Sequence, residues 1–173
     1  MHPTDKDHDF LQLILANKGI ILKICQLYCP GQTDREDLTQ DIIFQLWRSA
    51  GAYNKEYRFT TWMYRVALNT AISFYRAGRK RNALPLSDIH LALEDSPGPS
   101  ADAERLAGLQ ACIQGLKEFD RALILLYFEE KTYQEMAEIM GISETNVATR
   151  LSRIKEKLKK CMFSKYVREL APG

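Results

Sequence analysis

The segment TYQEMAEIMGISETNVATRLSRIKEKLKK, residues 132–160, constrains the fold more than any other part of the chain. Thr132 and Glu135 have the spacing of a capping box, which predicts that a helix begins at the residue after Thr132. Gly141 can end that helix in the left-handed conformation. Ser143 is then a suitable N-cap for a second helix. Two helices joined by a short glycine turn predict a helix-turn-helix.

The second helix of this motif has two unlike sides. Val147, Leu151, Ile154 and Leu158 recur at helical spacing, which predicts an apolar stripe that packs on the preceding helices. Small polar groups and arginines on the other side suit base edges in a DNA major groove, and lysines suit phosphates. The DNA-contact candidates are Thr145, Asn146, Thr149, Arg150, Ser152, Arg153 and Lys157. The alternative is a solvated basic helix on the surface of a bundle.

A proline-rich acidic segment divides the chain. Residues 83–103 hold three prolines, four acidic residues and no lysine or arginine, which predicts an extended acidic linker. Strand signals are nearly absent on both sides of it. We therefore expect an all-α protein with two small helical domains, 1–82 and 104–173, the second containing the helix-turn-helix. The expected helices are 9–28 (with a possible break near Gly19), 34–49, a helix that begins after Thr60 or Thr61 and ends near 79, and 102–115, 118–130, 133–140 and 144–163.

The N-terminal block has one helix with mixed acidic and aromatic character, DREDLTQDIIFQLW. Thr33 and Glu36 predict a capping box at its start. Leu38, Ile42 and Leu46 are expected in the core. Glu36, Asp37, Gln40, Phe44 and Trp47 lie near one side of the same helix, and aromatic groups mixed with acids suit a protein partner. The alternative is a helix that is buried on more than one side.

The next helix, FTTWMYRVALNTAISFYRAGRKR, has a largely polar stripe that runs through Arg65, Asn69, Ile72 and Arg76. It follows the loop AYNKEYRF, so basic groups and aromatic rings alternate over a short stretch. Cations suit a nucleic-acid backbone and rings suit unstacked bases, which indicates binding to single-stranded nucleic acid. Three aromatics in the helix are expected mainly in the core: Phe59, Trp62 and Phe74.

Several classes of protein are not indicated. The four cysteines and three histidines lack zinc spacing, so the cysteines are interpreted as reduced, mostly buried thiols. Neither a nucleophile–base pair nor a phosphate loop is recognisable, so we expect no enzyme, cofactor or metal. No apolar run approaches the roughly 20 residues of a membrane helix, and the polar start is unlike a signal peptide. A cytoplasmic location is expected.

Taken in order, these three motifs resemble those of an extracytoplasmic-function sigma factor, a small member of the bacterial sigma-70 family. The resemblance covers nearly the whole chain. It implies a factor that binds core RNA polymerase and the −10 and −35 elements of promoter DNA. It also implies contacts with the β′ clamp and β flap, an anti-sigma factor as partner, and a linker in the polymerase channel.

The resemblance assigns roles to particular positions. Asp37, Gln40, Asp41 and Trp47 would contact the β′ clamp, and the surface from Leu123 to Phe128 would meet the β flap. The helix from residue 144 would read the −35 element, although Ala148 stands where many members have a basic residue. The −10 candidates are Tyr53, Asn54, Tyr57, Arg58, Arg65, Asn69 and Arg76. The alternative function is a stand-alone helix-turn-helix transcriptional regulator, which would bind duplex DNA without polymerase.

Overall fold

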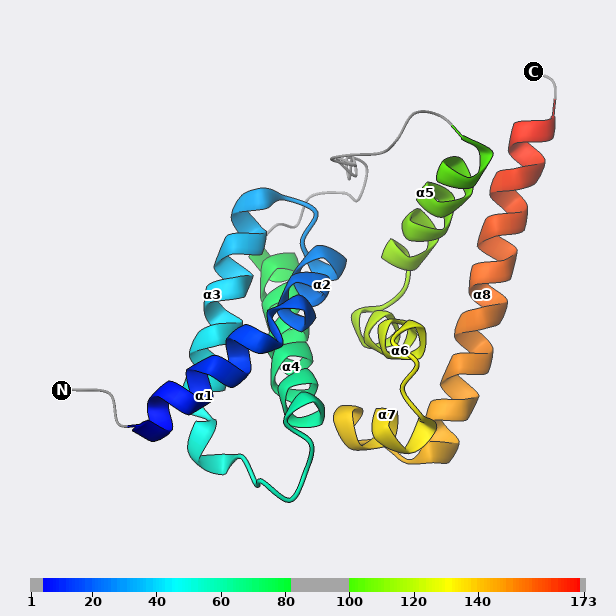
Figure 1. Cartoon of the computed structure of the whole chain (residues 1–173). Helices are drawn as coiled ribbons and strands as arrows, with labels where there is room; N and C mark the ends of the chain where they lie inside the picture. The colour runs from blue at the N-terminus through cyan, green and yellow to red at the C-terminus, as the bar shows by residue number, and fades with distance from the viewer. Residues whose placement is uncertain (1–4, 82–99, 172–173) are drawn as a thin grey trace. The chain divides into compact units, whose positions relative to one another are not determined.

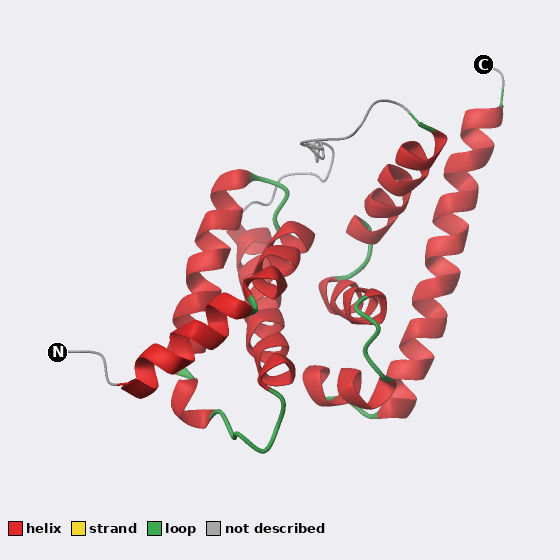
Figure 2. Ribbon diagram, viewed as in Figure 1, coloured by secondary structure: helices red, strands yellow, loops and turns green. Residues whose placement is uncertain are grey.

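The computed structural model describes residues 5–81 and 100–171, and within these ranges it contains helices and no strand (Figure 2). The chain divides into two compact units, Met1–Ile89 and His90–Gly173, here called the N-terminal and C-terminal units. The all-α prediction with two helical domains is confirmed. The predicted linker lies outside the described residues up to position 99, and the boundaries at 82 and 104 stay predictions.

The N-terminal unit packs three helices on one another and adds a fourth at its start (Figure 1). Its elements are α1 (Asp5–Ala16), α2 (Lys18–Tyr28), α3 (Gln32–Arg48), a short 3-10 turn (Ala50–Ala52) and α4 (Phe59–Arg81). The contacts join α2, α3 and α4 in pairs. Leu38, Ile42 and Leu46 of α3 are fully buried, as their helical spacing predicts.

The possible break near Gly19 is confirmed: α1 ends at Ala16 and α2 begins at Lys18, and the Asn17 side-chain amide between them donates to the Leu13 carbonyl at 2.9 Å. The predicted start of the next helix is wrong. The third helix begins at Gln32 with Gly31 as N-cap and no side-chain cap, so Thr33 lies inside it. An extended Gly31 lets the helix start before the expected capping box is reached.

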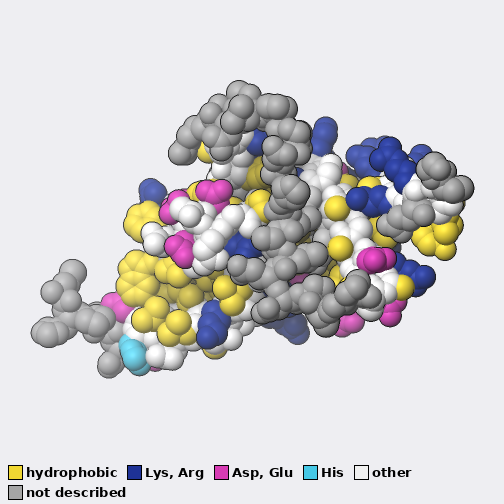
Figure 3. Space-filling model, turned by 90° about the horizontal axis from the view of Figure 1, so that it is seen from above, with side chains coloured by type: hydrophobic (Ala, Val, Ile, Leu, Met, Phe, Trp, Pro, Cys, Tyr) yellow, Lys and Arg dark blue, Asp and Glu magenta, His cyan; other side chains and the backbone are white. Residues whose placement is uncertain are grey.

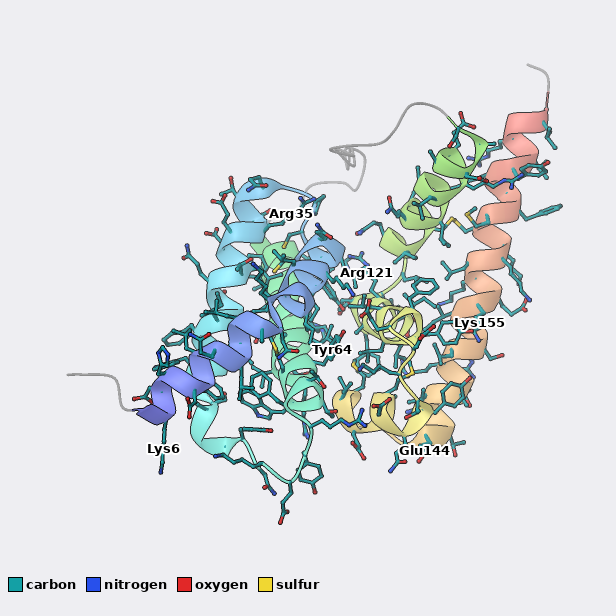
Figure 4. All side chains as sticks on the ribbon, viewed as in Figure 1. Lys6, Arg35, Tyr64, Arg121, Glu144 and Lys155 are labelled. Carbon is teal, nitrogen blue, oxygen red and sulfur yellow. A yellow bond between two sulfur atoms is a disulfide. The ribbon has the colours of Figure 1, made fainter. Side chains whose placement is uncertain are left out.

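Arg35 ties the end of α2 to the start of α3. Its guanidinium donates to the Cys29 carbonyl at 2.7 Å and to the Pro30 carbonyl at 3.0 Å (Figure 4). These carbonyls follow the last turn of α2, where backbone acceptors lack helical partners. The arginine therefore fixes the short turn that the prolyl residue forces on the chain.

The C-terminal unit is arranged around one long helix. Its elements are α5 (Ala101–Gln114), α6 (Glu118–Phe128), α7 (Tyr133–Met140) and α8 (Glu144–Leu170), and α8 contacts the other three. The last helix extends seven residues beyond the predicted end at 163. No helix-breaking residue intervenes before Ala171, and the extension carries three exposed large apolar side chains, Tyr166, Val167 and Leu170.

The caps of the helix-turn-helix are confirmed. Thr132 accepts from the Glu135 amide at 3.1 Å, and the Glu135 carboxylate accepts from the Thr132 amide at 2.8 Å. Gly141 ends α7 in the left-handed region with φ of 67°. Ser143 accepts from the Asn146 amide at 3.1 Å and so starts α8.

The cysteines behave differently in the two units. Cys25 and Cys29 are buried free thiols, as predicted. Burial raises the pKa of Cys25, and burial together with the nearby Asp34 charge raises the pKa of Cys29 to about 12. The prediction for the other pair is wrong, because Cys112 and Cys161 form a disulfide with Cα atoms 5.9 Å apart. Packing of α5 on α8 brings together residues that are 49 positions apart in the sequence.

Among the described residues, no single helix is long and apolar enough to cross a membrane. Only α1 and α2 taken as a pair, with a 54° bend between them, reach that length and hydropathy. On the face drawn in Figure 3, hydrophobic side chains (yellow) lie at the surface next to lysine and arginine side chains (dark blue).

Candidate nucleic-acid interface

The apolar stripe of α8 is buried as predicted. Val147, Leu151, Ile154 and Leu158 are between 0% and 8% exposed, and they face α5, α6 and α7. Burial of this stripe orients the rest of the helix outward. The first turns of α8 therefore present their polar residues to solvent, on the side of the helix that a major groove would receive.

Four predicted contacts on α8 are exposed: Thr145, Ser152, Arg153 and Lys157. Within the described part of the chain, Arg153 and Lys157 have no hydrogen-bond or ion-pair partner. Thr149 is also exposed, and its hydroxyl donates to the Thr145 carbonyl at 3.0 Å. The Arg153 and Lys157 side chains can therefore bind phosphates or base edges without breaking a contact within the described residues.

Arg150 and Asn146 are engaged within the protein. The Arg150 guanidinium donates to Asp120 Oδ1 at 3.2 Å and to Asn146 Oδ1 at 3.1 Å. It also lies over the Phe119 ring, 4.8 Å from the centroid. A contact between α6 and α8 thus fixes two side chains that the sequence places on the candidate DNA face.

A second arginine, Arg121 of α6, is buried and bonds to the segment that precedes this helix. It is 3% exposed and donates to the Leu116 carbonyl at 3.0 Å and to the Gln114 carbonyl at 2.6 Å. Gln114 is the last residue of α5 and Leu116 lies in the turn that follows, so Arg121, labelled in Figure 4, joins α6 to the end of α5. Sequence reasoning missed Phe119, Asp120 and Arg121, because their partners lie on other elements; only the charged pair before an apolar run hinted at them.

The polar stripe on α4 is partly as predicted. Arg65, Asn69 and Arg76 are exposed along this helix. Ile72 is 6% exposed and belongs to the core, so its inclusion in the surface stripe is wrong. Its position turns toward α2 and α3, which pack on that side of α4.

The loop before α4 closes on an aromatic cluster. The Tyr53 ring lies 5.4 Å from Phe59 and 5.3 Å from Trp62, and Phe10 of α1 lies 5.7 Å from each of these two rings. The Tyr53 hydroxyl also donates to the Tyr57 carbonyl at 3.0 Å. This cluster holds the loop in a defined shape against the start of α4.

Three aromatics predicted mainly in the core are less buried than expected. Phe59, Trp62 and Phe74 are all half-buried. The first two take part in the surface cluster, where rings cover one another instead of entering the core. The other loop candidates, Asn54, Tyr57 and Arg58, are exposed, and the Asn54 amide donates to Glu56 at 3.1 Å.

The predicted partner face of α3 is exposed. Asp37, Gln40 and Asp41 are on the surface, and Trp47 is 47% exposed. The predicted partner surface in the C-terminal unit is largely wrong. Leu123, Ile124 and Leu126 are at most 2% exposed and belong to the core of that unit, Leu125 is half-buried, and Tyr127 and Phe128 are the exposed large apolar groups of this segment.

Within the described ranges, no group of three or more His, Cys, Asp or Glu side chains could hold a metal ion. A cation–π contact joins α8 to α6, because the Lys155 ammonium lies 4.1 Å from the Tyr127 ring centroid. Such cation–π contacts hold a long side chain in place on the surface.

The two units match two known sequence families. Residues 13–81 match sigma-70 region 2, and residues 106–158 match sigma-70 region 4. These matches coincide with the N-terminal unit and with the part of the C-terminal unit that holds the helix-turn-helix.

Relatives and one solved structure agree with this. The chain is 30% identical over 132 residues to RNA polymerase sigma factor YlaC of Bacillus subtilis, covering 73% of this chain and 76% of that protein. It is 29% identical over 154 residues to ECF sigma factor SigE of Mycolicibacterium smegmatis, covering 86% of this chain. The fold is similar to that of sigma factor RpoE, solved with anti-sigma factor NepR from Bartonella quintana. The TM-score is 0.70 at 20% identity, over 89% of this chain and 96% of that chain.

The match does not span every relative from end to end. The chain covers 59% of the length of the Mycolicibacterium protein and 43% of a sigma factor relative, RfaY, from Xanthomonas campestris. This chain belongs to the sigma-70 family of RNA polymerase sigma factors, in its extracytoplasmic-function group.

Proposed function

We propose that this chain joins core RNA polymerase in the cytoplasm and directs it to promoters that carry a −10 and a −35 element. Family membership supports the general role. The observation that carries the assignment for this chain is the helix-turn-helix, whose buried stripe leaves a polar and basic face on the first turns of α8. The protein would contribute binding and positioning, while the polymerase performs the chemistry.

The C-terminal unit would bind the −35 element through the major groove. Backbone phosphates supply most of the affinity and base edges supply the sequence preference. The exposed Arg153 suits either role, because guanidinium pairs well with guanine and with phosphate. The proposed contacts are Thr145, Asn146, Thr149, Ser152, Arg153 and Lys157.

The N-terminal unit would hold the unpaired −10 strand. Removing a base from the stack costs a few kcal/mol, so a preformed receptor is needed. The aromatic cluster around Tyr53 supplies a loop of fixed shape, and the exposed α4 stripe supplies amide and cationic groups beside it. The proposed −10 contacts are Tyr53, Asn54, Tyr57, Arg58, Arg65, Asn69 and Arg76.

Two surfaces would bind proteins. The exposed face of α3, with Asp37, Gln40, Asp41 and Trp47, would contact the β′ clamp of polymerase. Tyr127 and Phe128 are the exposed groups that remain for the β flap. An anti-sigma factor is a further expected partner, since RpoE of Bartonella quintana, whose fold is similar, was solved in complex with the anti-sigma factor NepR.

The test is transcription in vitro with core polymerase in the presence and absence of the protein, with start sites mapped across a genomic template set. We expect new, discrete start sites only when the protein is added. Asn69→Ala should impair open-complex formation more than −35 binding, and Trp47→Ala should weaken association with core polymerase. A protein that binds duplex promoter DNA tightly without polymerase, and leaves start sites unchanged, would instead be a stand-alone regulator.

A further inference from the structure

The Asn146 side chain is held in one of its two possible amide orientations. Arg150 Nε donates to Asn146 Oδ1 at 3.1 Å. A guanidinium has donors and no acceptor, so the carboxamide oxygen, and not its nitrogen, must face the arginine. The Asn146 Nδ2 group, which has no recorded partner within the described residues, is therefore the end left to solvent.

Arg150 is itself fixed by α6. Its Nη1 donates to Asp120 Oδ1 at 3.2 Å, and its guanidinium lies over the Phe119 ring at 4.8 Å. The Asp120 side chain is only 11% exposed, whereas the Arg150 side chain is 41% exposed. An acid this buried needs its charged partner, which keeps the guanidinium in place rather than free to turn toward DNA.

The backbone beneath Asn146 is fixed as well. The backbone N–H of Asn146 donates to the Ser143 hydroxyl at 3.1 Å, so Asn146 lies in the capped first turn of α8. In helix-turn-helix proteins, residues near the start of the second helix contact base edges. The cap and the arginine together determine where the free amide nitrogen points.

We infer that Arg150 is a positioning residue that presents the Asn146 amide nitrogen to a hydrogen-bond acceptor on a −35 base edge. This inference rests on the proposed function and deepens it. Acceptors on major-groove edges are N7 and O6 of guanine, N7 of adenine and O4 of thymine, whereas cytosine offers only a donor. Asn146 therefore selects an acceptor-bearing base at one position, and Arg150 contributes to that choice without contacting the base.

The experiment measures binding and initiation by the reconstituted holoenzyme on promoters with a randomised −35 element and a constant −10 element. The variants are Asn146→Ala, Asn146→Asp, Arg150→Lys and the double variant of Asn146→Ala with Arg150→Lys. The matched control is Glu156→Gln, which removes another ion pair of α8, the exposed one between Glu156 and Lys159 at 3.5 Å. Circular dichroism of each variant verifies that α8 remains folded.

Asn146→Ala should reduce discrimination at one base pair by about 2- to 13-fold, the range expected for one neutral hydrogen bond. Arg150→Lys should reduce discrimination at the same base pair, and it should add nothing in the Asn146→Ala background. Asn146→Asp keeps an oxygen toward Arg150 but replaces the outer donor by an acceptor, so its preference should move to a base that offers a donor. Glu156→Gln should leave the profile unchanged.

Other results would overturn the inference while leaving the proposed function intact. A uniform loss across all −35 sequences for Arg150→Lys would make Arg150 a phosphate contact. If Arg150→Lys loses discrimination at a different base pair from the one affected by Asn146→Ala, Arg150 contacts a base directly. An unchanged preference in Asn146→Asp would remove the donor role. If the wild-type holoenzyme shows no −35 preference at all, both the proposed promoter reading and the inference fail.

Discussion

Breaking the Cys112–Cys161 bond should destabilise the C-terminal unit by about 4 kcal/mol. The bond closes a loop with a sequence separation of 49, which contains α6, α7 and the first part of α8. Chain entropy gives about 3 kcal/mol for a 15-residue loop and about 4.7 kcal/mol for a 100-residue loop, so this loop lies between them. The core of so small a domain rarely supplies more than about 3–5 kcal/mol, so the reduced unit should be close to unfolding.

The two tryptophans make this measurable within one sample. Trp47 and Trp62 both lie in the N-terminal unit, so their fluorescence follows that unit alone, while far-ultraviolet circular dichroism follows both units. With a urea dependence of about 1 kcal/mol per molar, reduction should lower the circular-dichroism midpoint of the C-terminal unit by about 3–4 M. The fluorescence midpoint should not change, because Cys25 and Cys29 are already free thiols.

Cys161→Ser provides the control. It should reproduce the effect of dithiothreitol and should itself be insensitive to that reductant. A thiol count in denaturant should give two free thiols for the oxidised protein. The reasoning is refuted if four thiols are counted, or if reduction shifts the fluorescence midpoint as much as the circular-dichroism midpoint.

The remaining predictions concern a thiol and a turn. The folded N-terminal unit keeps the Cys29 proton up to a pKa of about 12, whereas the ordinary value is 9.0, so its stability should fall as pH rises above about 9. At pH 10 this loss should be about 1 kcal/mol, and it should be smaller in Cys29→Ala, where only Cys25 keeps a raised pKa, as measured by urea unfolding at several pH values; equal slopes in both proteins would contradict it. Gly141→Ala should cost about 1–2 kcal/mol in the C-terminal unit, because φ is 67° there and an added Cβ meets nothing within 4 Å. Gly78→Ala, inside α4 with equally open surroundings, should stabilise the N-terminal unit by about 0.5–1 kcal/mol, and a loss at both glycines would show that space rather than φ decides.

Features that depend on neighbours in the sequence were predictable. The capping box at Thr132 and Glu135, the left-handed Gly141 and the cap at Ser143 all involve residues within a few positions of one another. Helix termini have unsatisfied backbone groups wherever they occur, so a suitable side chain next to them predicts the cap. The buried stripe of α8 was predictable for the same reason, since its period is a property of one helix.

Features that depend on contacts between helices were not. The buried Ile72 and the buried Leu123, Ile124 and Leu126 differ from the predictions because packing against neighbouring helices decides which side of a helix faces inward. The half-buried state of Phe59 and Trp62 likewise depends on Phe10, which lies on another helix.

The sequence by itself determined that the chain is helical, the caps of α7 and α8, the family, and which residues face outward on the first turns of α8. Only the tertiary structure decided that Cys112 joins Cys161 and that Asp120 holds Arg150 against Asn146, because these partners lie 49 and 30 positions apart. Periodicity and capping are local properties of a chain. A charge pair or a disulfide between helices requires the packing of α5 and α6 on α8, which no local pattern encodes.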